Sequence, residues 1–365
     1  MATALFGCSS TGSVSAGSGL PADLQPQLNS GYSAWVVKFK KRAVAKGISQ
    51  PVLTEAFRNS GYLPGVVARD RNQVEFKRSL EDYLAIAASE ERVAKGRTAF
   101  QQYGSVLRAL ETRYGVDAEI IAAIWGLESY YGERRGAVPV ISATSTLAYD
   151  GRRGSFFEKQ LMAALRILQN GDIDAAGLTG SWAGAMGHTQ FIPTSYEAFA
   201  VDFTGDGRRD IWSEDPSDAL ASTAAYLQRN GWQRGQPWGR EHLGGSGSGQ
   251  IIQPQPGGPR FAVNKNFAVI KRYNNSDAYA IGVGHLADRI AGAGELQTPF
   301  PPDAYGLTKT DRVELQQRLT AAGFDTGGAD GVLGPKSRAA ISAYQTSLGQ
   351  TASGDPSVAL LQSLR

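Results

Sequence analysis

Apolar residues recur at the spacing of an α-helix through most of the first two thirds of this 365-residue chain. Two segments show the pattern, with Val74, Leu80, Tyr83, Leu84, Ile86 and Ala87 in one and Leu161, Ala164, Leu165 and Leu168 in the other. Glycines interrupt it at Gly104, Gly151, Gly171 and Gly231, so we expect helices of ordinary length. Strand patterns are few, near residues 250–252 and 267–273. The sequence therefore predicts a mainly α fold, formally α+β.

The composition excludes several functional classes. Hydrophobic residues make up 42% and charged residues 19% of the chain, as in a globular protein of two or three domains. A net charge of +3 is too small to indicate nucleic-acid binding. One cysteine makes no internal disulfide, and three scattered histidines lack metal-ligand spacing. No apolar run reaches the roughly 18 to 20 residues that a membrane-spanning helix needs.

Composition also indicates the domain boundaries. The segment Leu5-Phe-Gly-Cys8 is similar to the end of a bacterial lipoprotein signal. Under that interpretation Cys8 carries a lipid anchor and residues 1–19 form a disordered tether; the alternative is an ordinary disordered start. Gly/Ser-rich residues 244–258 are expected to form a loop, and Pro-rich residues 296–306 a linker. We therefore expect a large domain at 20–295 and a small one at 307–365.

One acidic residue lies where a core residue is expected. A helix should begin near Asp117 and end at Gly132, and in it Glu128 shares a face with Ile121, Ile124 and Trp125. Burial beside Trp125 and the negative helix end would both raise the pKa of Glu128. A carboxyl group kept protonated near neutral pH suits a general acid that protonates a glycosidic oxygen. The alternative is a buried ion pair with Arg152 or Arg153.

Aromatic and polar residues that suit a sugar-binding cleft follow at 129–132, 181–193 and 273–279. Five segments together form a distinctive set of motifs, namely Arg69–Phe76, Ile124–Gly132, Leu147–Phe157, Gly180–Phe191 and Tyr273–Tyr279. With these motifs the chain resembles, over roughly residues 20–293, the membrane-bound lytic transglycosylase B group, glycoside hydrolase family 103. The resemblance implies a lysozyme-like helical catalytic domain and a periplasmic protein of a Gram-negative bacterium.

The resemblance also implies an activity, cleavage of the MurNAc–GlcNAc β-1,4 bond of peptidoglycan with formation of a 1,6-anhydromuramoyl end. It assigns the single general acid/base to Glu128. The substrate-binding residues that it implies are Ser181, Met186, Gln190, Tyr226, Tyr273, Asn274 and Tyr279, with Arg152 and Arg153 near the acid or the peptide stem. A hydrolytic muramidase and a non-catalytic cell-wall-binding protein remain as alternatives. Asp150 and Glu133 are the acids to test if the reaction needs a second carboxylate.

An acidic loop between residues 202 and 218 has the spacing of a calcium-binding loop. Oxygen-bearing side chains occupy positions 1, 3, 5 and 9 and glycine position 6, but position 12 is Ser213 where a glutamate is usual. In the resembling family a later aspartate closes the loop, which implies Asp202, Thr204, Asp206, the Arg208 carbonyl and Asp218 as ligands. We expect a structural Ca²⁺ or Na⁺ here, or a turn without metal, and no cofactor for catalysis.

The C-terminal segment 307–364 resembles a three-helix peptidoglycan-binding module. Its signature is an Asp330-Gly-x-x-Gly334 turn between two amphipathic segments. A phosphate loop at 328–337 is excluded because Pro335 removes an amide that such a loop would use. The expected partners are peptidoglycan glycan strands and, through Cys8, a membrane; no nucleic acid is expected, and we expect a monomer.

Overall fold

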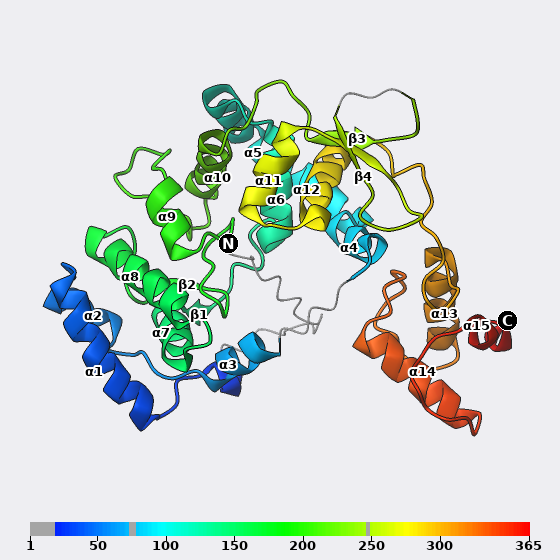
Figure 1. Ribbon diagram of the computed structural model, residues 1–365, viewed down its shortest axis with the longest axis horizontal. Helices are drawn as coiled ribbons and strands as arrows, with labels where there is room; N and C mark the ends of the chain where they lie inside the picture. The colour runs from blue at the N-terminus through cyan, green and yellow to red at the C-terminus, as the bar shows by residue number, and fades with distance from the viewer. Residues whose placement is uncertain (1–18, 73–77, 246–248) are drawn as a thin grey trace.

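The computed structural model describes residues 19–72, 78–245 and 249–365. Cys8 and residues 1–18 of the expected tether lie outside the described residues, as do residues 73–76 of the first family motif. Helices dominate the described part of the chain (Figure 1), as the apolar spacing predicts. No described helix is both long and apolar enough to cross a membrane.

The first half of the described chain is almost entirely helical. Its elements are η1 (Ala22–Leu24), α1 (Ser30–Ala45), α2 (Gln50–Ala56), α3 (Pro64–Arg71), α4 (Leu80–Ala87), α5 (Glu90–Tyr114), α6 (Ala118–Ser129), β1 (Val138–Pro139), α7 (Val140–Asp150), α8 (Gly154–Asn170), β2 (Thr179–Gly180) and α9 (Pro193–Phe199). Gly151 and Gly171, two of the predicted breakers, are the left-handed caps of α7 and α8.

The second half adds a small sheet and the C-terminal helices. Its elements are α10 (Ser217–Arg229), β3 (Gly239–Glu241), β4 (Gln250–Ile252), β5 (Phe261–Val263), α11 (Lys265–Tyr273), α12 (Asp277–Ile290), α13 (Lys309–Ala321), α14 (Pro335–Ser347) and α15 (Val358–Leu364). The strands pair antiparallel in the order β3-β5-β4, and β1 pairs antiparallel with β2.

One of the two strand predictions is confirmed and the other is wrong. Residues 250–252 form β4, but residues 267–273 belong to helix α11. In α11, Phe267 and Ile270 lie three residues apart on one helix face and pack into the central core. A short apolar run fits either structure, and here the contact with α12 favours the helix.

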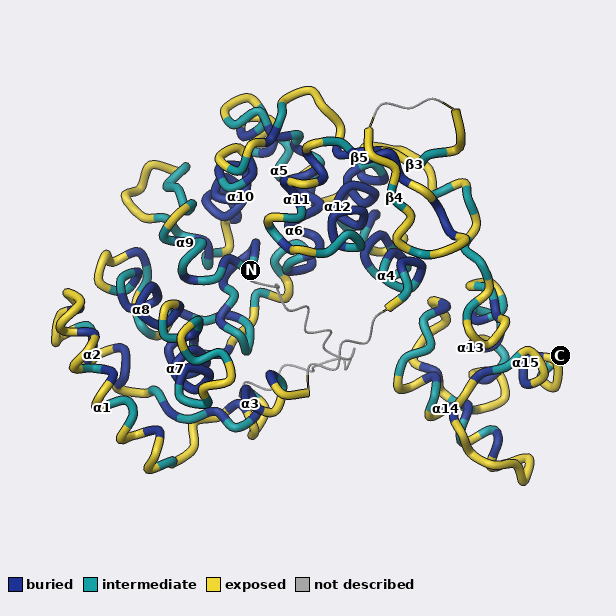
Figure 2. Tube along the Cα trace, in the orientation of Figure 1, coloured by how far each residue is buried: buried dark blue, intermediate teal, exposed yellow. Residues whose placement is uncertain are grey.

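Three hydrophobic clusters fill the large helical part, and the smallest joins α3 to α7 and α8. The central cluster surrounds α6 with α5, α10 and α12, and the second joins α7 and α8 to α1 and α2 (Figure 1). Figure 2 shows α6, α12 and the inner faces of α7 and α8 as buried. Within α6 only Glu119 and Glu128 keep intermediate exposure, so this helix is buried nearly all round and not along a single stripe.

Helices α13, α14 and α15 pack around a hydrophobic cluster of their own, which includes Leu315, Leu319 and Ile341. The Pro-rich segment before them is not detached from the large part, because Leu296 and Phe300 pack against the central cluster. Arg312 on α13 also reaches Glu81 on α4, with a side-chain exposure of 4% for Arg312 and 10% for Glu81. The C-terminal helices are therefore held against α4 by a buried ion pair.

Candidate active site

Glu128 is in the last turn of α6, beside the centre of the core. Asp117 occupies the N-cap position as expected, although its side chain makes no capping hydrogen bond. The helix ends at Ser129, three residues before the predicted end at Gly132, because Tyr130 adopts the left-handed conformation. The end of α6 thus lies directly after Glu128, where the negative end of the helix disfavours a second negative charge.

The surroundings of Glu128 favour its neutral form. Ile124 and Trp125 on the preceding turn are buried, whereas Glu128 keeps intermediate exposure. Its one hydrogen-bond partner among the described residues is Tyr279, whose Oη donates to Oε1 over 2.6 Å. Burial raises the pKa of Glu128 to about 8, although the hydrogen bond from Tyr279 acts in the opposite direction. Glu128 therefore holds a proton at neutral pH and is accessible enough to give it up.

The backbone around Glu128 is in an unusual conformation. Among the described residues, three that are not glycine have positive φ, namely Tyr130 at 55°, Tyr131 at 59° and Gln190 at 55°. Two of them directly follow the helix end that carries Glu128. A left-handed conformation costs such residues about 1 to 3 kcal/mol each, and outliers of this kind cluster at functional sites. The strain therefore supports this region as the functional site.

Ser181, Met186 and Gln190 come from one compact loop after β2. The Oγ of Ser181 accepts a hydrogen bond from the Ala185 amide over 3.1 Å, and Met186 pairs with Phe191. Gln190 donates to the Arg135 carbonyl over 3.0 Å. Met186 has no exposed surface, so the expectation that it contacts substrate does not fit: its side chain supports the loop from within the second hydrophobic cluster.

Tyr226, Tyr273 and Tyr279 belong to α10, α11 and α12. The rings of Tyr226 and Tyr273 have centroids 4.9 Å apart, and Tyr273 donates to the Thr189 carbonyl over 2.6 Å. Burial, followed by the nearby charge of Glu128, raises the pKa of both Tyr273 and Tyr279. Asn274, between them in the chain, is buried. Tyr226 donates to the Arg272 carbonyl over 2.6 Å.

Arg152 and Arg153 are bound elsewhere. Both arginines donate to the buried carboxylate of Asp70, at 2.6 Å from Arg152 and 2.5 Å from Arg153. Burial alone would raise the pKa of Asp70, but the hydrogen bonds and charges of the two arginines lower it. The alternative that Glu128 is neutralised by one of these arginines is therefore wrong. Their expected position near the acid is not supported by a contact.

The two acids considered as a second carboxylate are paired with basic side chains. Asp150 accepts a hydrogen bond from Arg71 over 2.5 Å, and Glu133 binds Lys95. Neither acid contacts Glu128. Within the part of the chain that the structure describes, Glu128 is thus the one candidate acid of this site that lacks a basic partner.

The sequence analysis missed His188, although this residue lies within one of the family motifs. It is buried, with 3% exposure, and its Nδ1 accepts a hydrogen bond from the Trp125 indole over 3.1 Å. Its Nε2 donates to the Ser213 carbonyl over 2.7 Å, and its own carbonyl accepts from Ser129 over 2.5 Å. Both partners on α6 flank Glu128 in the chain. A lone histidine carries no spacing signal, so only the tertiary structure reveals it.

The acidic loop brings carboxylates together. One oxygen from each of Asp202, Asp206 and Asp218 lies within 4.8 Å of the others, and none of the three pairs with a basic side chain among the described residues. Asp218 is buried and accepts three backbone amides, and burial raises its pKa. Burial of Asp202 acts in the same direction, but backbone hydrogen bonds lower its pKa overall. Thr204 Oγ1 lies 3.4 Å from Asp202. Oxygen ligands of this kind fit a hard cation such as Ca²⁺.

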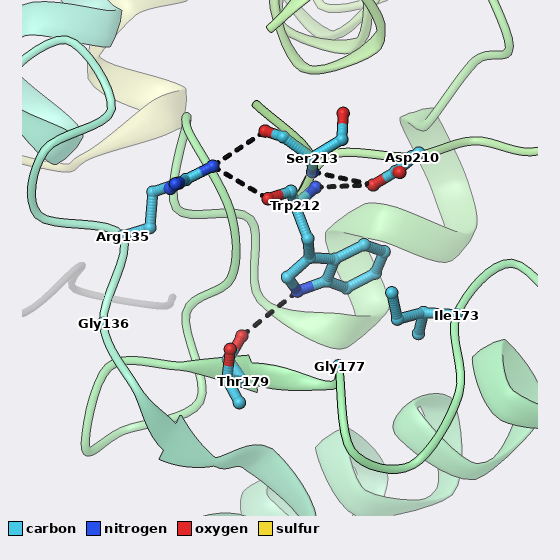
Figure 3. A pocket seen from close by; sticks show the side chains of 8 residues that line it. All are labelled: Arg135, Gly136, Ile173, Gly177, Thr179, Asp210, Trp212 and Ser213. Atoms are coloured by element: carbon cyan, nitrogen blue, oxygen red, sulfur yellow. Dashed lines mark hydrogen bonds between the residues drawn. The ribbon is translucent and has the colours of Figure 1, made fainter. Parts of the chain in front are cut away.

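A pocket of about 360 Å³ adjoins this loop (Figure 3). The Trp212 indole, which donates to the Thr179 carbonyl over 3.1 Å, forms one wall, and Arg135 forms another. Glu128 does not line this pocket. The pocket is therefore separate from the group that would perform chemistry. Arg135, which lines it, accepts a hydrogen bond at its carbonyl from Gln190 over 3.0 Å.

Comparison with protein families gives two matches along the chain. The family described as Transglycosylase SLT domain matches residues 31–250 and 241–288. A second family, described as a peptidoglycan binding domain, matches residues 308–364. The first match includes α6 with Glu128, and the second includes α13, α14 and α15.

Similar proteins occur in two bacterial species. Membrane-bound lytic murein transglycosylase B of Escherichia coli (strain K12) is 32% identical over 234 residues, which are 55% of this chain and 64% of that protein. The structure of SltB3 from Pseudomonas aeruginosa in complex with NAG-NAM-pentapeptide is 42% identical, with a TM-score of 0.73, and covers 92% of this chain and 100% of that one. A second structure of SltB3 holds NAG-anhNAM-pentapeptide.

Another similar structure contains calcium. The structure of the lytic transglycosylase Slt35 of Escherichia coli in complex with calcium is 27% identical to this chain. It has a TM-score of 0.61 and covers 72% of this chain and 93% of that one.

Proposed function

The chain belongs to the Transglycosylase SLT domain family, and from this membership and the state of Glu128 we propose that it is a peptidoglycan lytic transglycosylase. It would cleave the MurNAc–GlcNAc β-1,4 bond and leave a 1,6-anhydromuramoyl end. The observation that carries the proposal is a partly exposed carboxyl group whose pKa is raised to about 8 at a strained helix end. The SltB3 complexes with NAG-NAM and NAG-anhNAM peptides support the same substrate and product.

Glu128 would act twice in one turnover. As the neutral acid it gives its proton to the glycosidic oxygen, and the bond to the anomeric carbon of MurNAc breaks. The 2-acetamido carbonyl of that sugar would trap the anomeric carbon, which replaces the second carboxylate that most glycosidases use. The Glu128 carboxylate then removes the proton from the C6 hydroxyl. The C6 oxygen attacks the anomeric carbon, and the bond from that carbon to the acetamido oxygen breaks. The proton returns to Glu128 and no water is consumed.

Tyr279 would stabilise the carboxylate form that Glu128 takes between the two steps. Its Oη donates to Glu128 Oε1, so the hydrogen bond strengthens when the carboxyl group becomes a carboxylate. Tyr279 is nearly inaccessible, with 1% exposure, so it would hold Glu128 from behind and not contact the sugar. Burial alone would raise the pKa of Glu128 further, so the hydrogen bond from Tyr279 keeps Glu128 able to release its proton.

The choice between ring closure and hydrolysis would depend on how the cleft holds the sugar. An intramolecular hydroxyl group has an effective concentration far above that of a mobile water, provided that it is held in place. We propose that Ser181, Gln190 and Tyr273, which keep intermediate exposure, bind the glycan near Glu128, and that Asn274, which is buried, supports them. Arg152 and Arg153, which remain 47% and 32% exposed in their side chains, would bind a carboxylate of the peptide stem farther away.

The acidic loop would hold a structural Ca²⁺. Asp202, Asp206 and Asp218 supply three negative charges without a basic partner, which fits a divalent cation better than an apo turn. The Thr204 hydroxyl and the Arg208 carbonyl would complete the ligands. The cation would neutralise the three carboxylates and stabilise the loop, and it takes no part in bond cleavage.

The remaining predictions concern the domains of the chain, its location and its attachment to a membrane. Residues 20–295 would form the catalytic unit, residues 296–306 the connection and residues 307–365 a wall-binding module. Peptidoglycan of a Gram-negative bacterium lies in the periplasm, so the protein would act there as a monomer on glycan strands. Attachment to a membrane through Cys8 stays a prediction.

Digestion of purified sacculi tests the function. The wild type should release muropeptides with anhydro ends, which lack the elements of one water by mass spectrometry. Glu128→Gln should bind sacculi and release none, whereas Glu133→Gln, the same change at an exposed glutamate, should act as the wild type does. Reducing-end products would identify a hydrolytic muramidase. A wild type that binds but releases nothing would identify a wall-binding protein.

A further inference from the structure

His188 joins two parts of the molecule that are distant in the chain. On one side it contacts α6, where Trp125 donates to its Nδ1 over 3.1 Å and Ser129 donates to its carbonyl over 2.5 Å. On the other side its Nε2 donates to the carbonyl of Ser213, which follows the acidic loop. Its backbone amide also donates to the Ile211 carbonyl over 3.1 Å. Both ring nitrogens are therefore used, one as acceptor and one as donor.

These contacts require one protonation state of the ring. An imidazole that accepts at Nδ1 and donates at Nε2 is neutral and in a single tautomer. Burial lowers the pKa of His188, which agrees with that state. The ring also lies against Gly132, where a Cβ atom would be 2.6 Å from Cε1 of His188. The hydrogen bonds at both ring nitrogens and the closeness of Gly132 thus fix the orientation of His188.

The acidic loop connects to His188 through a short series of hydrogen bonds. The Asp210 amide donates to Asp218 over 2.9 Å, and the Asp210 carboxylate accepts from the amides of Trp212 and Ser213 (Figure 3). Arg135 donates to the carbonyls of Trp212 and Ser213 over 2.9 Å and 2.7 Å. The Ser213 carbonyl therefore receives hydrogen bonds from both Arg135 and His188.

From this geometry we propose that His188 is a positioning residue that couples the acidic loop at 202–218 to the helix that carries Glu128. A cation bound by Asp202, Asp206 and Asp218 would hold their carboxylates in place, and with them the segment 210–213 that is hydrogen-bonded to Asp218. His188, which is hydrogen-bonded to Ser213, would then hold Trp125 and Ser129 in place. These two residues lie three positions before and one position after Glu128. The placement of the Glu128 carboxyl group then depends on a loop whose own carboxylates do not touch it.

The kinetic consequence rests on the proposed function, but the coupling itself does not. A misplacement of a catalytic group by about 1 Å can cost roughly 100-fold in rate, whereas substrate binding over a long cleft is hardly affected. Loss of His188 should therefore lower kcat and leave KM nearly unchanged. Loss of a merely structural residue would instead lower the amount of folded protein without changing kcat per folded molecule.

The first test follows the Trp125 indole by ¹⁵N NMR while Ca²⁺ alone is added to the full chain. In the wild type the Trp125 signal should shift at the calcium concentrations that raise the melting temperature. In His188→Gln, which cannot accept from Trp125 at the same place, the melting temperature should still rise and the Trp125 signal should not follow. Asp206→Asn should weaken both responses.

A matched control is His285→Gln. His285 is also a buried histidine of the same domain, and burial lowers its pKa to about 4, but it makes no contact with the series from Asp218 to Trp125. Its variant should retain the calcium response of Trp125. The proposal is overturned if calcium raises the wild-type melting temperature without moving the Trp125 signal, or if His285→Gln loses the response as His188→Gln does.

The second test is kinetic and uses soluble glycan strands. His188→Gln should reduce kcat at least about tenfold with KM within about twofold, while His285→Gln changes neither. If His188→Gln does not fold, Trp125→Phe removes the same hydrogen bond from the other partner and should give the same pattern. Equal kcat values in folded His188→Gln and wild type would overturn the proposal. A wild type without any turnover would refute the proposed function and leave the NMR test of the coupling intact.

Discussion

Replacement of Glu128 by glutamine should stabilise the folded protein at alkaline pH. The pKa of Glu128 is about 8 in the folded protein against 4.5 for an ordinary glutamate. The folded state therefore binds the proton more tightly than the unfolded state, and the free energy of unfolding falls as the pH rises from about 4.5 through about 8. Glutamine carries no titratable proton, so Glu128→Gln escapes this loss.

The size of the effect follows from the shift in pKa. Moving the pKa from 4.5 to about 8 corresponds to about 5 kcal/mol at pH values above both. Because Glu128 keeps intermediate exposure, water reduces the penalty, and we expect about 2 to 4 kcal/mol. This is a large part of the roughly 5 to 15 kcal/mol that stabilises an ordinary domain.

Urea unfolding at about pH 5 and about pH 8.5 measures the effect. The free energy of unfolding of Glu128→Gln minus that of the wild type should increase by about 2 to 4 kcal/mol between the two conditions. Glu133→Gln is the matched control, because Glu133 is 55% exposed in its side chain and binds Lys95. The reasoning is refuted if the difference for Glu128→Gln is the same at both pH values, or if Glu133→Gln shows the same increase.

Three further predictions concern neighbouring features of the structure. Tyr279→Phe removes a hydrogen bond that lowers the pKa of Glu128, so the alkaline limit of activity should move upward by about one pH unit, which pH–rate profiles would measure. Asp218→Asn should abolish the stabilisation by Ca²⁺, seen as a rise in melting temperature; in the wild type the free energy of unfolding should increase by about 2.7 kcal/mol at a calcium concentration of about 100 times Kd. Arg312→Met leaves Glu81 buried without its partner and should cost about 3 kcal/mol by calorimetry, whereas Arg318→Met at a partly exposed pair should cost about 1 kcal/mol or less.

The sequence was sufficient to predict the mainly helical fold and to single out Glu128. Helical spacing and glycine caps are local signals, so the helices around Gly151 and Gly171 follow from them. An acid on an apolar helix is also a local signal, and the structure confirms that Glu128 stands among buried residues. The segment 267–273 was misassigned because short apolar runs fit a strand as well as a helix.

The contacts of the site could not be predicted, since they depend on which distant segments pack together. Nothing local indicates that Tyr279 reaches Glu128, 151 positions away, or that Arg152 and Arg153 bind Asp70. Met186 belongs to a motif that resembles a substrate site, yet its side chain has no exposed surface. A motif records which residues occur together, and only the packing separates those that face the cleft from those that support it.

The protonation state of Glu128 can be measured directly by ¹³C NMR of protein labelled at the glutamate carboxyl carbons, as the difference between wild type and Glu128→Gln. The signal present only in the wild type should titrate with a pKa of about 8. A signal that titrates near 4.5, the value of an ordinary glutamate, would contradict the assignment of Glu128 as the proton donor.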